Sequence, residues 1–400
     1  MIVLVLNCGS SSLKYQVLDM KSGQEYNLLA KGLVERIGME MGDITHTVAG
    51  HEKYMLHKPI ATHTEGIKSV LDLLVSGGQG VLESLQQIDA VGHRVAHGGE
   101  YFSGSRRVDA TVIEKIEKCC ELAPLHNPAN LLGIRAIKEL MPHTPQVAVF
   151  DTSFHQTIPD YAYMYAIPYE YYSKYKIRRY GFHGTSHRYV AQKAAGLAGI
   201  EFEKSRIITC HLGNGSSVTA ICNGKSIDTS MGFTPVEGVV MGTRCGNVDA
   251  GVVTYLQDKE GLDFKEMNVV LNKKSGFLGV SGVSSDSRDV NAAAATDKRA
   301  ALTLEMFKYS VLKYVGAYAA VMNGVDLIVF TGGIGENDST VREYISTRCA
   351  YLGVDFDPSV NYGLRGKDMI LTKGGSKVVV AVVTTNEELV IAQDTMRLAE

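Results

Sequence analysis

The sequence lacks several features that would each indicate a particular class of protein. It has no apolar run long enough to span a bilayer, and the first apolar run is only as long as a strand and follows no basic segment. Forty basic side chains nearly balance 43 acidic ones, for a formal net charge of −3. We therefore expect no membrane span and no signal peptide, and the charge balance argues against a dedicated nucleic-acid-binding protein.

The cysteines do not suit a disulfide framework. There are seven of them, an odd number, and no pair has the CxxC spacing of many zinc and redox motifs. A chain of 400 residues can bury its own core without such cross-links. We therefore expect free thiols in a reducing compartment, which indicates a cytoplasmic protein.

Two segments about half a chain apart share one layout: a short apolar strand, a Gly/Ser turn and a second strand. NCGSSSLKYQVL follows a strand predicted at Ile2–Leu6, and HLGNGSSVTAIC follows one predicted at Ile207–Thr209. Such turns are common, so coincidence is the alternative, but the shared layout favours a duplication. We expect two related α/β domains, residues 1–150 and 151–385, with a helix at about 386–400 that packs on the first.

The other predicted strands each end in a polar residue or a glycine-rich turn. IDAVGH leads to Arg94, PQVAVF to Asp151, VDLIVF to TGGIGEN, and KVVVAVV to TTNEE. Helices are predicted between them, for example at 301–322. Ligands of open α/β sheets bind outside the carboxyl ends of the strands. The residues expected to converge there are Asn7, Arg94, Asp151, His211, Gly333 and Glu387.

Three segments could hold a nucleotide. The glycines of GGIGEN let a backbone approach a phosphate or adenine, although the segment has neither the Lys-Ser/Thr of a Walker A loop nor the full spacing of a dinucleotide fingerprint, and HLGNGSS is a second glycine-rich turn. In SSDSRDV, Asp286 could bind a ribose and Arg288 could stack on a base. The alternatives are a simple strand-to-helix turn for GGIGEN and a helix N-cap for Asp286.

Two arginines and one histidine suit an anionic ligand. Arg94 and Arg244 each stand alone in apolar, glycine-flanked surroundings, where a guanidinium needs an anionic partner. The alternative partners are Glu100 and Asp249. His183, in RRYGFHGTSH, is either a phosphate contact or an ordinary structural histidine. The histidine pairs spaced by four residues lack the HExxH pattern, so no zinc site is predicted.

The motifs taken together resemble those of the acetate kinase family. They are NCGSSSLKY, GHRVAHGGE, APLHNP, VFDTSFH, RRYGFHGTSH, HLGNGSS, MGFTPVEG, MGTRCGNVD, FTGGIGEN and TNEE, which run in order from residue 7 to residue 388. The resemblance implies two duplicated ribonuclease H-like domains that flank a nucleotide cleft, as in actin, Hsp70 and sugar kinases. It also implies direct in-line transfer of a phosphoryl group from ATP to acetate, with Mg²⁺ or Mn²⁺, in a homodimer.

The resemblance assigns the site residues one by one. The implied catalytic residues are Arg94, Asp151, His183 and Arg244, and the implied metal ligands are Asn7 and Glu387, with Glu388 the alternative to Glu387. The implied nucleotide-binding residues are Lys14, His211, Leu212, Gly213, Asn214, Gly215, Asp286, Ser287, Arg288, Gly333, Ile334, Gly335, Glu336 and Asn337. The implied carboxylate-binding residues are Arg94, Ala96, Leu125, His126, Phe182 and Pro235.

Two details bear on mechanism and specificity. A carboxylate acceptor is already ionised at neutral pH, so Asp151 is expected to orient Arg94, Arg244 or metal-bound water and not to act as a base. The family usually has a branched residue where this chain has Ala96, so the pocket for the methyl group is expected to be wider. The alternatives are a propionate or butyrate kinase, an ATPase module of the Hsp70 or actin type, and a sugar kinase.

Overall fold

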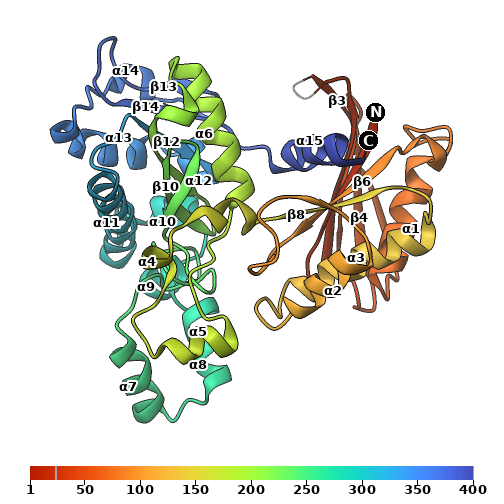
Figure 1. Cartoon of the computed structure of the whole chain (residues 1–400), viewed down its shortest axis with the longest axis horizontal. Coiled ribbons are helices and arrows are strands. Elements are labelled where there is room, and N and C mark those ends of the chain that lie inside the picture. The colour runs from red at the N-terminus through yellow and green to blue at the C-terminus, as the bar shows by residue number, and fades with distance from the viewer. Residues whose placement is uncertain (23–24, 400) are drawn as a thin grey trace. The chain divides into compact units, whose positions relative to one another are not determined.

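The computed structural model describes residues 1–22 and 25–399. The contacts within the chain define two compact units. Unit 1 comprises Met1–Ser153 together with Asn386–Glu400, and unit 2 comprises Phe154–Thr385. Each unit contains one mixed sheet and the helices that pack on it (Figure 1). None of the helices in the described part of the chain combines the length and the apolar composition that a bilayer crossing requires.

In unit 1 the strands of the described residues lie in the order β5-β4-β3-β2-β1-β6-β8-β7. The hairpin β1–β2 is antiparallel, whereas β6 pairs in parallel with both β1 and β8. The strands are β1 Ile2–Cys8, β2 Ser12–Met20, β3 Tyr26–Glu35, β4 Gly42–Val48, β5 Tyr54–Lys58, β6 Ala90–Val95, β7 Arg106–Arg107 and β8 Gln146–Phe150. Because β1, β6 and β8 run parallel to one another, their carboxyl ends, where the polar residues were predicted, lie at the same edge of the sheet.

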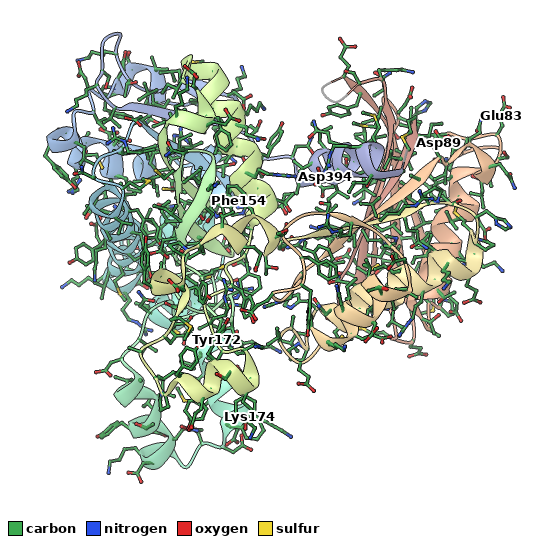
Figure 2. The ribbon with its side chains drawn as sticks, viewed as in Figure 1. Glu83, Asp89, Phe154, Tyr172, Lys174 and Asp394 are labelled. Carbon is green, nitrogen blue, oxygen red and sulfur yellow. The ribbon has the colours of Figure 1, made fainter. Side chains whose placement is uncertain are left out.

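The helices of unit 1 cover this sheet. They are α1 His63–Leu74, α2 Ala110–Lys118, α3 Asn127–Leu140 and α15 Glu387–Ala399. The C-terminal helix α15 contacts β1, β6 and β8 (Figure 1), and Ser105 Oγ donates a 2.6 Å hydrogen bond to its Asp394, labelled in Figure 2. A Cβ atom at Gly92 of β6 would lie 2.3 Å from Thr395 Oγ1, so only glycine lets α15 approach this closely.

Unit 2 repeats the arrangement. Its strand order is β11-β10-β9-β12-β14-β13, with β9–β10 and β10–β11 antiparallel and β9, β12 and β14 mutually parallel. The strands are β9 Arg206–Leu212, β10 Ser216–Cys222, β11 Lys225–Thr229, β12 Leu327–Thr331, β13 Met369–Ile370 and β14 Val379–Val382. The order and directions match β3-β2-β1-β6-β8 of unit 1, which confirms the predicted α/β class and the duplication.

The largest core of unit 2 lies between its sheet and the long helix α11. That helix begins at Lys298, three residues before the prediction, because the side chain of Asp297 caps its first turn. The helices are α4 Asp160–Tyr163, α5 Tyr169–Tyr175, α6 Gly184–Ala198, α7 Ala250–Glu260, α8 Phe264–Lys273, α9 Gly276–Ser281, α10 Ser287–Ala293, α11 Lys298–Val321, α12 Gly332–Asn337, α13 Ser339–Arg348 and α14 Pro358–Asn361.

One local prediction needs correction. GGIGEN forms the short helix α12 and not a turn. Gly332 has φ +77°, and a Cβ atom there would lie 2.7 Å from the backbone oxygen of Leu212. Glycine at this position lets the chain pass from the buried strand β12 directly into the helix against the neighbouring strand.

Candidate active site

A cluster of charged side chains lies at the carboxyl edge of the sheet of unit 1. Arg94, near the end of β6, holds Asp151 in a fork, with Nη2 2.6 Å from Oδ2 and Nε 3.0 Å from Oδ1. Arg94 Nη1 donates to Asn7 Oδ1 at 3.4 Å, and Arg94 Nε lies 4.0 Å from Glu387 Oε2. The first turn of α15 and three parallel strand ends thus bring together four of the predicted residues.

Burial and mutual repulsion shape the electrostatics of this cluster. The side chain of Asp151 is 3% exposed, and its charge raises the pKa of Arg94. Burial raises the pKa of Glu387 to about 7; Arg94 opposes this shift, and the carboxylates of Asp151 and Glu388 add to it. An additional positive charge beside Glu387 would therefore be stabilising.

The same cluster fits a divalent metal ion bound through oxygen. Glu387 offers a carboxylate and Asn7 a carboxamide oxygen, which are donors that Mg²⁺ prefers. Within residues 1–22 and 25–399 no three His, Cys, Asp or Glu side chains form a ready metal cage. Mg²⁺ usually keeps waters and binds through one or two carboxylates together with substrate phosphates, so two protein ligands suffice.

Lys14 belongs to this cluster. It pairs with Asn7 in the β1–β2 hairpin, and its exposed ammonium group lowers the pKa of Glu387. Lys14 therefore lies in unit 1, whereas the other predicted nucleotide-binding residues lie in unit 2.

Besides Arg94, three of the predicted carboxylate-binding residues belong to unit 1: Ala96, Leu125 and His126. The Ala96 N–H donates to Asn130 Oδ1 at 3.0 Å, and the His97 N–H donates to Asn127 Oδ1 at the same distance. These bonds fasten the segment after β6 to the start of α3. Leu125 directly precedes His126, the N-cap residue of α3, and the residue is 64% exposed, so it is open to a ligand.

In unit 2, His183 and Arg244 approach the turn HLGNGSS. A Cβ atom at Gly215 would lie 3.3 Å from Arg244 Nη1 and 3.6 Å from His183 Nε2. His183 has φ +56° at the start of α6, and its ring stacks on His211 with the ring centroids 4.3 Å apart. The two side chains therefore lie on the same side of this turn.

Arg244 has no carboxylate partner among the described residues. Its Nη1 donates to the backbone oxygen of Pro235 at 3.2 Å, and burial lowers its pKa. The alternative partner, Asp249, instead caps α7 by accepting from the Gly251 N–H. A half-buried guanidinium without a counter-ion is suited to bind an anion.

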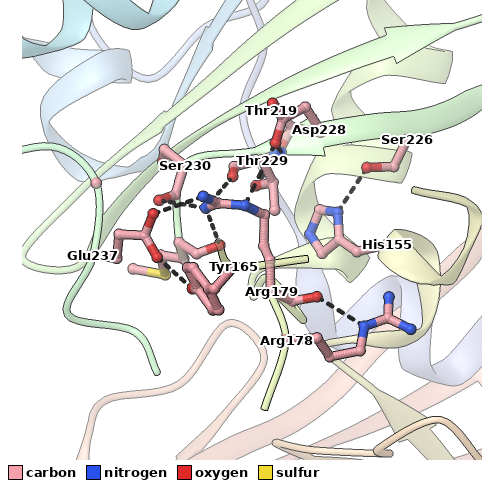
Figure 3. A network of polar contacts seen from close by, with 12 residues as sticks. His155, Tyr165, Arg178, Arg179, Thr219, Ser226, Asp228, Thr229, Ser230 and Glu237 are labelled. Carbon is pink, nitrogen blue, oxygen red and sulfur yellow. Dashed lines mark hydrogen bonds and ion pairs between the residues drawn. The ribbon is translucent and has the colours of Figure 1, made fainter. Parts of the chain in front are cut away.

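The segment that carries Pro235 is held by Arg179 (Figure 3). Arg179 Nη1 donates to the backbone oxygens of Thr229, Ser230 and Met231, and Nη2 lies 2.6 Å from Glu237 Oε1. Tyr165 donates to the other carboxylate oxygen of Glu237 (Figure 3). Phe182 packs on the two buried methionines Met231 and Met241. Phe182 and Pro235 are thereby fixed near Arg244.

A pocket of about 1040 Å³ lies beside the same turn, entirely within unit 2. It is large enough for a nucleotide. The predicted residues that line it are Gly213, Asn214, Asp286, Ser287, Arg288, Gly333, Ile334 and Asn337. Asp286 caps α10 and forms a 2.6 Å ion pair with Arg288, which lowers the pKa of Asp286 to about 2. Asp286 therefore both caps α10, the alternative considered from the sequence, and lines the pocket.

Other predicted nucleotide-binding residues of unit 2 lie beside this pocket without lining it. They are His211, Leu212, Gly215, Gly335 and Glu336. His211 Nδ1 bonds to Ser186 Oγ at 2.8 Å. Glu336 Oε1 accepts from the backbone N–H groups of Gly332 at 3.0 Å and Thr385 at 3.1 Å. Glu336 therefore bonds to the protein backbone in this structure.

The sequence prediction missed several residues that line the pocket. They are Gly242, Phe277, Ser285, Asn291, Asp338, Ser339, Thr340, Gly363, Leu364 and Arg365. Ser339 and Thr340 could have been found, because Asp338 caps α13 directly after the glycine-rich segment. Gly363 to Arg365 carry no motif, and only the fold brings them to the pocket.

The chain is similar over its whole length to proteins of one family. Residues 2–393 match a family model described as the acetokinase family. Acetate kinase of Thermoanaerobacterium thermosaccharolyticum is 56% identical over 400 residues, covering 100% of this chain and 99% of that protein. The solved structure of Porphyromonas gingivalis acetate kinase is 51% identical with a TM-score of 0.97 and full coverage of both chains. That of a propionate kinase from Francisella tularensis is 42% identical with a TM-score of 0.90 and 99% coverage of both.

Proposed function

Because the chain belongs to the acetokinase family, we propose that it transfers the γ-phosphoryl group of ATP reversibly to acetate, giving acetyl phosphate and ADP. The observation that carries the proposal is the turn from Gly213 to Gly215. Its first residues line a nucleotide-sized pocket, and its last lies against Arg244 and His183. The phosphate end of a nucleotide in that pocket would meet a guanidinium that has no counter-ion among the described residues.

Arg244 and His183 have the role of stabilising charge on the moving phosphoryl group. In its transition state this group carries negative charge on its equatorial oxygens, and little covalent chemistry is left to the protein. The N–H groups of Arg244 and His183 are held in place by Pro235, Ser217 and the stack on His211. Donors fixed in advance need no reorganisation when the charge develops.

Arg94 is proposed to bind the carboxylate substrate. Asp151 occupies its Nε and one Nη2 hydrogen, which leaves N–H groups for a second anion. Acetate is ionised at neutral pH and needs no base to activate it. Asp151 is therefore a positioning residue that fixes the plane of the Arg94 guanidinium.

Glu387 and Asn7 are the proposed ligands of the divalent metal, and we propose magnesium, with manganese as the alternative. When bound, this ion would neutralise part of the phosphate charge. Lys14 and the remaining N–H groups of Arg94 would add positive charge on the same side of unit 1. We further propose a cytoplasmic homodimer that binds neither nucleic acid nor membrane.

The deciding experiment traps the acyl phosphate product with hydroxylamine. The purified protein is incubated with ATP, Mg²⁺ and acetate, propionate or butyrate, and the hydroxamate is measured. We expect hydroxamate with acetate and a dependence on Mg²⁺. Slow ATP hydrolysis without hydroxamate for any acid would support an ATPase module instead, and phosphorylation of a sugar would support a sugar kinase.

A second substrate has a specific observation in its favour. Ala96 is buried and small, and in the methyl-group pocket that the family resemblance implies it would leave more room than a branched side chain. Propionate has one more methylene than acetate, a difference of about 1–3 kcal/mol in an apolar pocket. The ratio of kcat/KM for propionate to that for acetate therefore decides between acetate kinase and propionate kinase activity.

A further inference from the structure

A chain of four polar side chains leads through the interior of unit 2 to His183. Thr209 Oγ1 of β9 lies 2.7 Å from Nδ1 of His187, on α6. His187 Nε2 lies 2.7 Å from Ser217 Oγ of β10, which in turn lies 2.9 Å from His183 Nδ1. Thr209, His187 and Ser217 have no exposed surface, so water does not compete for these bonds. We name these four residues the histidine relay.

The hydroxyl of Thr209 sets the direction of the relay. Its one side-chain hydrogen bond, within the part of the chain that the structure describes, is to His187 Nδ1. If Thr209 Oγ1 accepted a hydrogen bond from His187 Nδ1, the hydroxyl proton of Thr209 would be buried without an acceptor, which costs free energy. Thr209 therefore donates to Nδ1 of His187.

The remaining bonds follow from this direction. Burial, with the neighbouring His155 and His211, lowers the pKa of His187 well below its ordinary value, so His187 is neutral. With Nδ1 accepting, its single proton lies on Nε2 and is donated to Ser217 Oγ. The hydroxyl proton of Ser217 then points to its other side-chain partner, His183 Nδ1.

We propose that Ser217, oriented by His187 and Thr209, is a positioning residue that keeps the proton of His183 on Nε2. This nitrogen lies 3.6 Å from the position that a Cβ atom at Gly215 would take, and Arg244 Nη1 lies 3.3 Å from the same position. The left-handed backbone of His183, at φ +56°, and its stack on His211 limit the ring to this orientation. The proposal rests on the proposed function, in which the Nε2–H donates to the phosphoryl group.

The reverse direction makes a different prediction. If His183 donated from Nδ1, Ser217 would donate to His187 Nε2, His187 would donate to Thr209, and the proton of Thr209 would have no described acceptor. The two directions thus differ in which nitrogen of His183 carries hydrogen. This difference is directly measurable and does not require catalysis.

The test combines nitrogen-15 NMR of histidine-labelled full-length protein with steady-state kinetics. The variants are Ser217→Ala, Ser217→Thr and Thr209→Val. The control is Thr219→Val, which removes an equally buried hydroxyl from the same strand, one that bonds to Thr229 at 2.8 Å outside the relay. His183→Gln assigns the signal of His183.

We expect the Nε2–H tautomer at His183 in the unmodified protein and a mixture of tautomers in Ser217→Ala and Thr209→Val. Ser217→Ala should lower kcat by on the order of 10- to 100-fold with KM values changed less than about threefold, because a misaligned donor weakens transition-state binding. Ser217→Thr, which keeps the hydroxyl, should retain the tautomer and most of kcat. Thr219→Val should retain both.

An Nδ1–H tautomer or a doubly protonated His183 in the unmodified protein would overturn the proposal. Equal losses of kcat in Ser217→Ala and Thr219→Val would also overturn it. If Ser217→Ala does not fold, the tautomer of His183 in Thr209→Val decides, and an unchanged tautomer there refutes the relay. If the unmodified protein has the expected tautomer but forms no acyl phosphate, the relay stands and the proposed function fails.

Discussion

The fork between Arg94 and Asp151 is the feature whose removal we expect to have the largest specific effect. Asp151→Asn keeps the size of the side chain but replaces one carboxylate oxygen, now bonded at 2.6 or 3.0 Å, with an amide NH₂ that cannot accept. Hydrogen bonds to charged groups contribute about 1.5–3 kcal/mol each. The loss of one such bond and of the charge itself is expected to raise the barrier by about 3 kcal/mol.

That change corresponds to a loss of about 100-fold in kcat/KM for acetate. KM for ATP should change less than about threefold, because the pocket is lined by residues of unit 2 only. At saturating Mg²⁺ the loss should be present on both sides of pH 7, since Asp151 is expected to orient Arg94 and not to accept a proton, and the pKa of Glu387 should fall because the Asp151 carboxylate raises it. Initial rates of hydroxamate formation with varied acetate measure all three quantities.

Asp326→Asn is a matched control. Asp326 holds Arg206 in the same fork, with Nη2–Oδ1 at 2.7 Å and Nε–Oδ2 at 3.1 Å, among residues that have no predicted role in catalysis. We expect its kcat/KM to stay within about twofold of the unmodified protein. Near-normal kcat/KM and metal dependence in Asp151→Asn, or an equal loss in Asp326→Asn, would refute the reasoning.

Three further changes test other parts of the structure. Glu387→Gln should raise the Mg²⁺ concentration for half-maximal rate by at least about tenfold. In the unmodified protein this concentration should rise as the pH falls below about 7, because Glu387 then gains a proton. A metal titration of Glu387→Gln beside Glu388→Gln shows which of the two carboxylates binds the metal. Burial lowers the pKa of His155 to about 4, so between about pH 6.5 and pH 4 only the unfolded state binds the extra proton, and the free energy of unfolding should fall by up to about 3 kcal/mol as the pH falls across that range. Urea unfolding of His155→Gln should lose this part of the pH dependence. An unchanged dependence of the unfolding free energy on pH would contradict the assignment. Ala96→Val should lower the kcat/KM ratio of propionate to acetate by about tenfold, and an unchanged ratio would show that this position does not bound the pocket.

The strand ends show how far a sequence pattern reaches. A buried β-branched run followed by a polar residue predicts that the residue lies at a sheet edge, and β1, β6, β8 and β12 are found where these runs occur. The pattern predicted that Arg94 and Asp151 converge, with Glu100 as the alternative partner of Arg94, and the structure pairs Arg94 with Asp151. Parallel pairing sets Val95 of β6 beside Phe150 of β8. Asp151 therefore lies within hydrogen-bond distance of Arg94, although the two residues are 57 positions apart in sequence.

The same distinction holds for the nucleotide pocket. Glycine-rich segments are recognisable because backbone freedom is a property of the residue itself, so Gly213 and Gly333 were predicted and line the pocket. Gly363, Leu364 and Arg365 have no such signal. Arg342, which is fully buried, donates to the backbone oxygens of both Gly335 and Leu364 at 2.9 Å and thereby links the two segments.

The amino-acid sequence by itself determined the α/β class, the two related hairpins and the kinds of side chain available for chemistry, because strand length, turn formation and charge depend on neighbouring residues. Only the tertiary structure decided which charges pair, which loops reach the pocket and which way a buried chain of hydrogen bonds runs. Those outcomes depend on contacts between residues far apart in sequence, as between Ser217 and His183, where burial removes water and makes each unpaired proton costly.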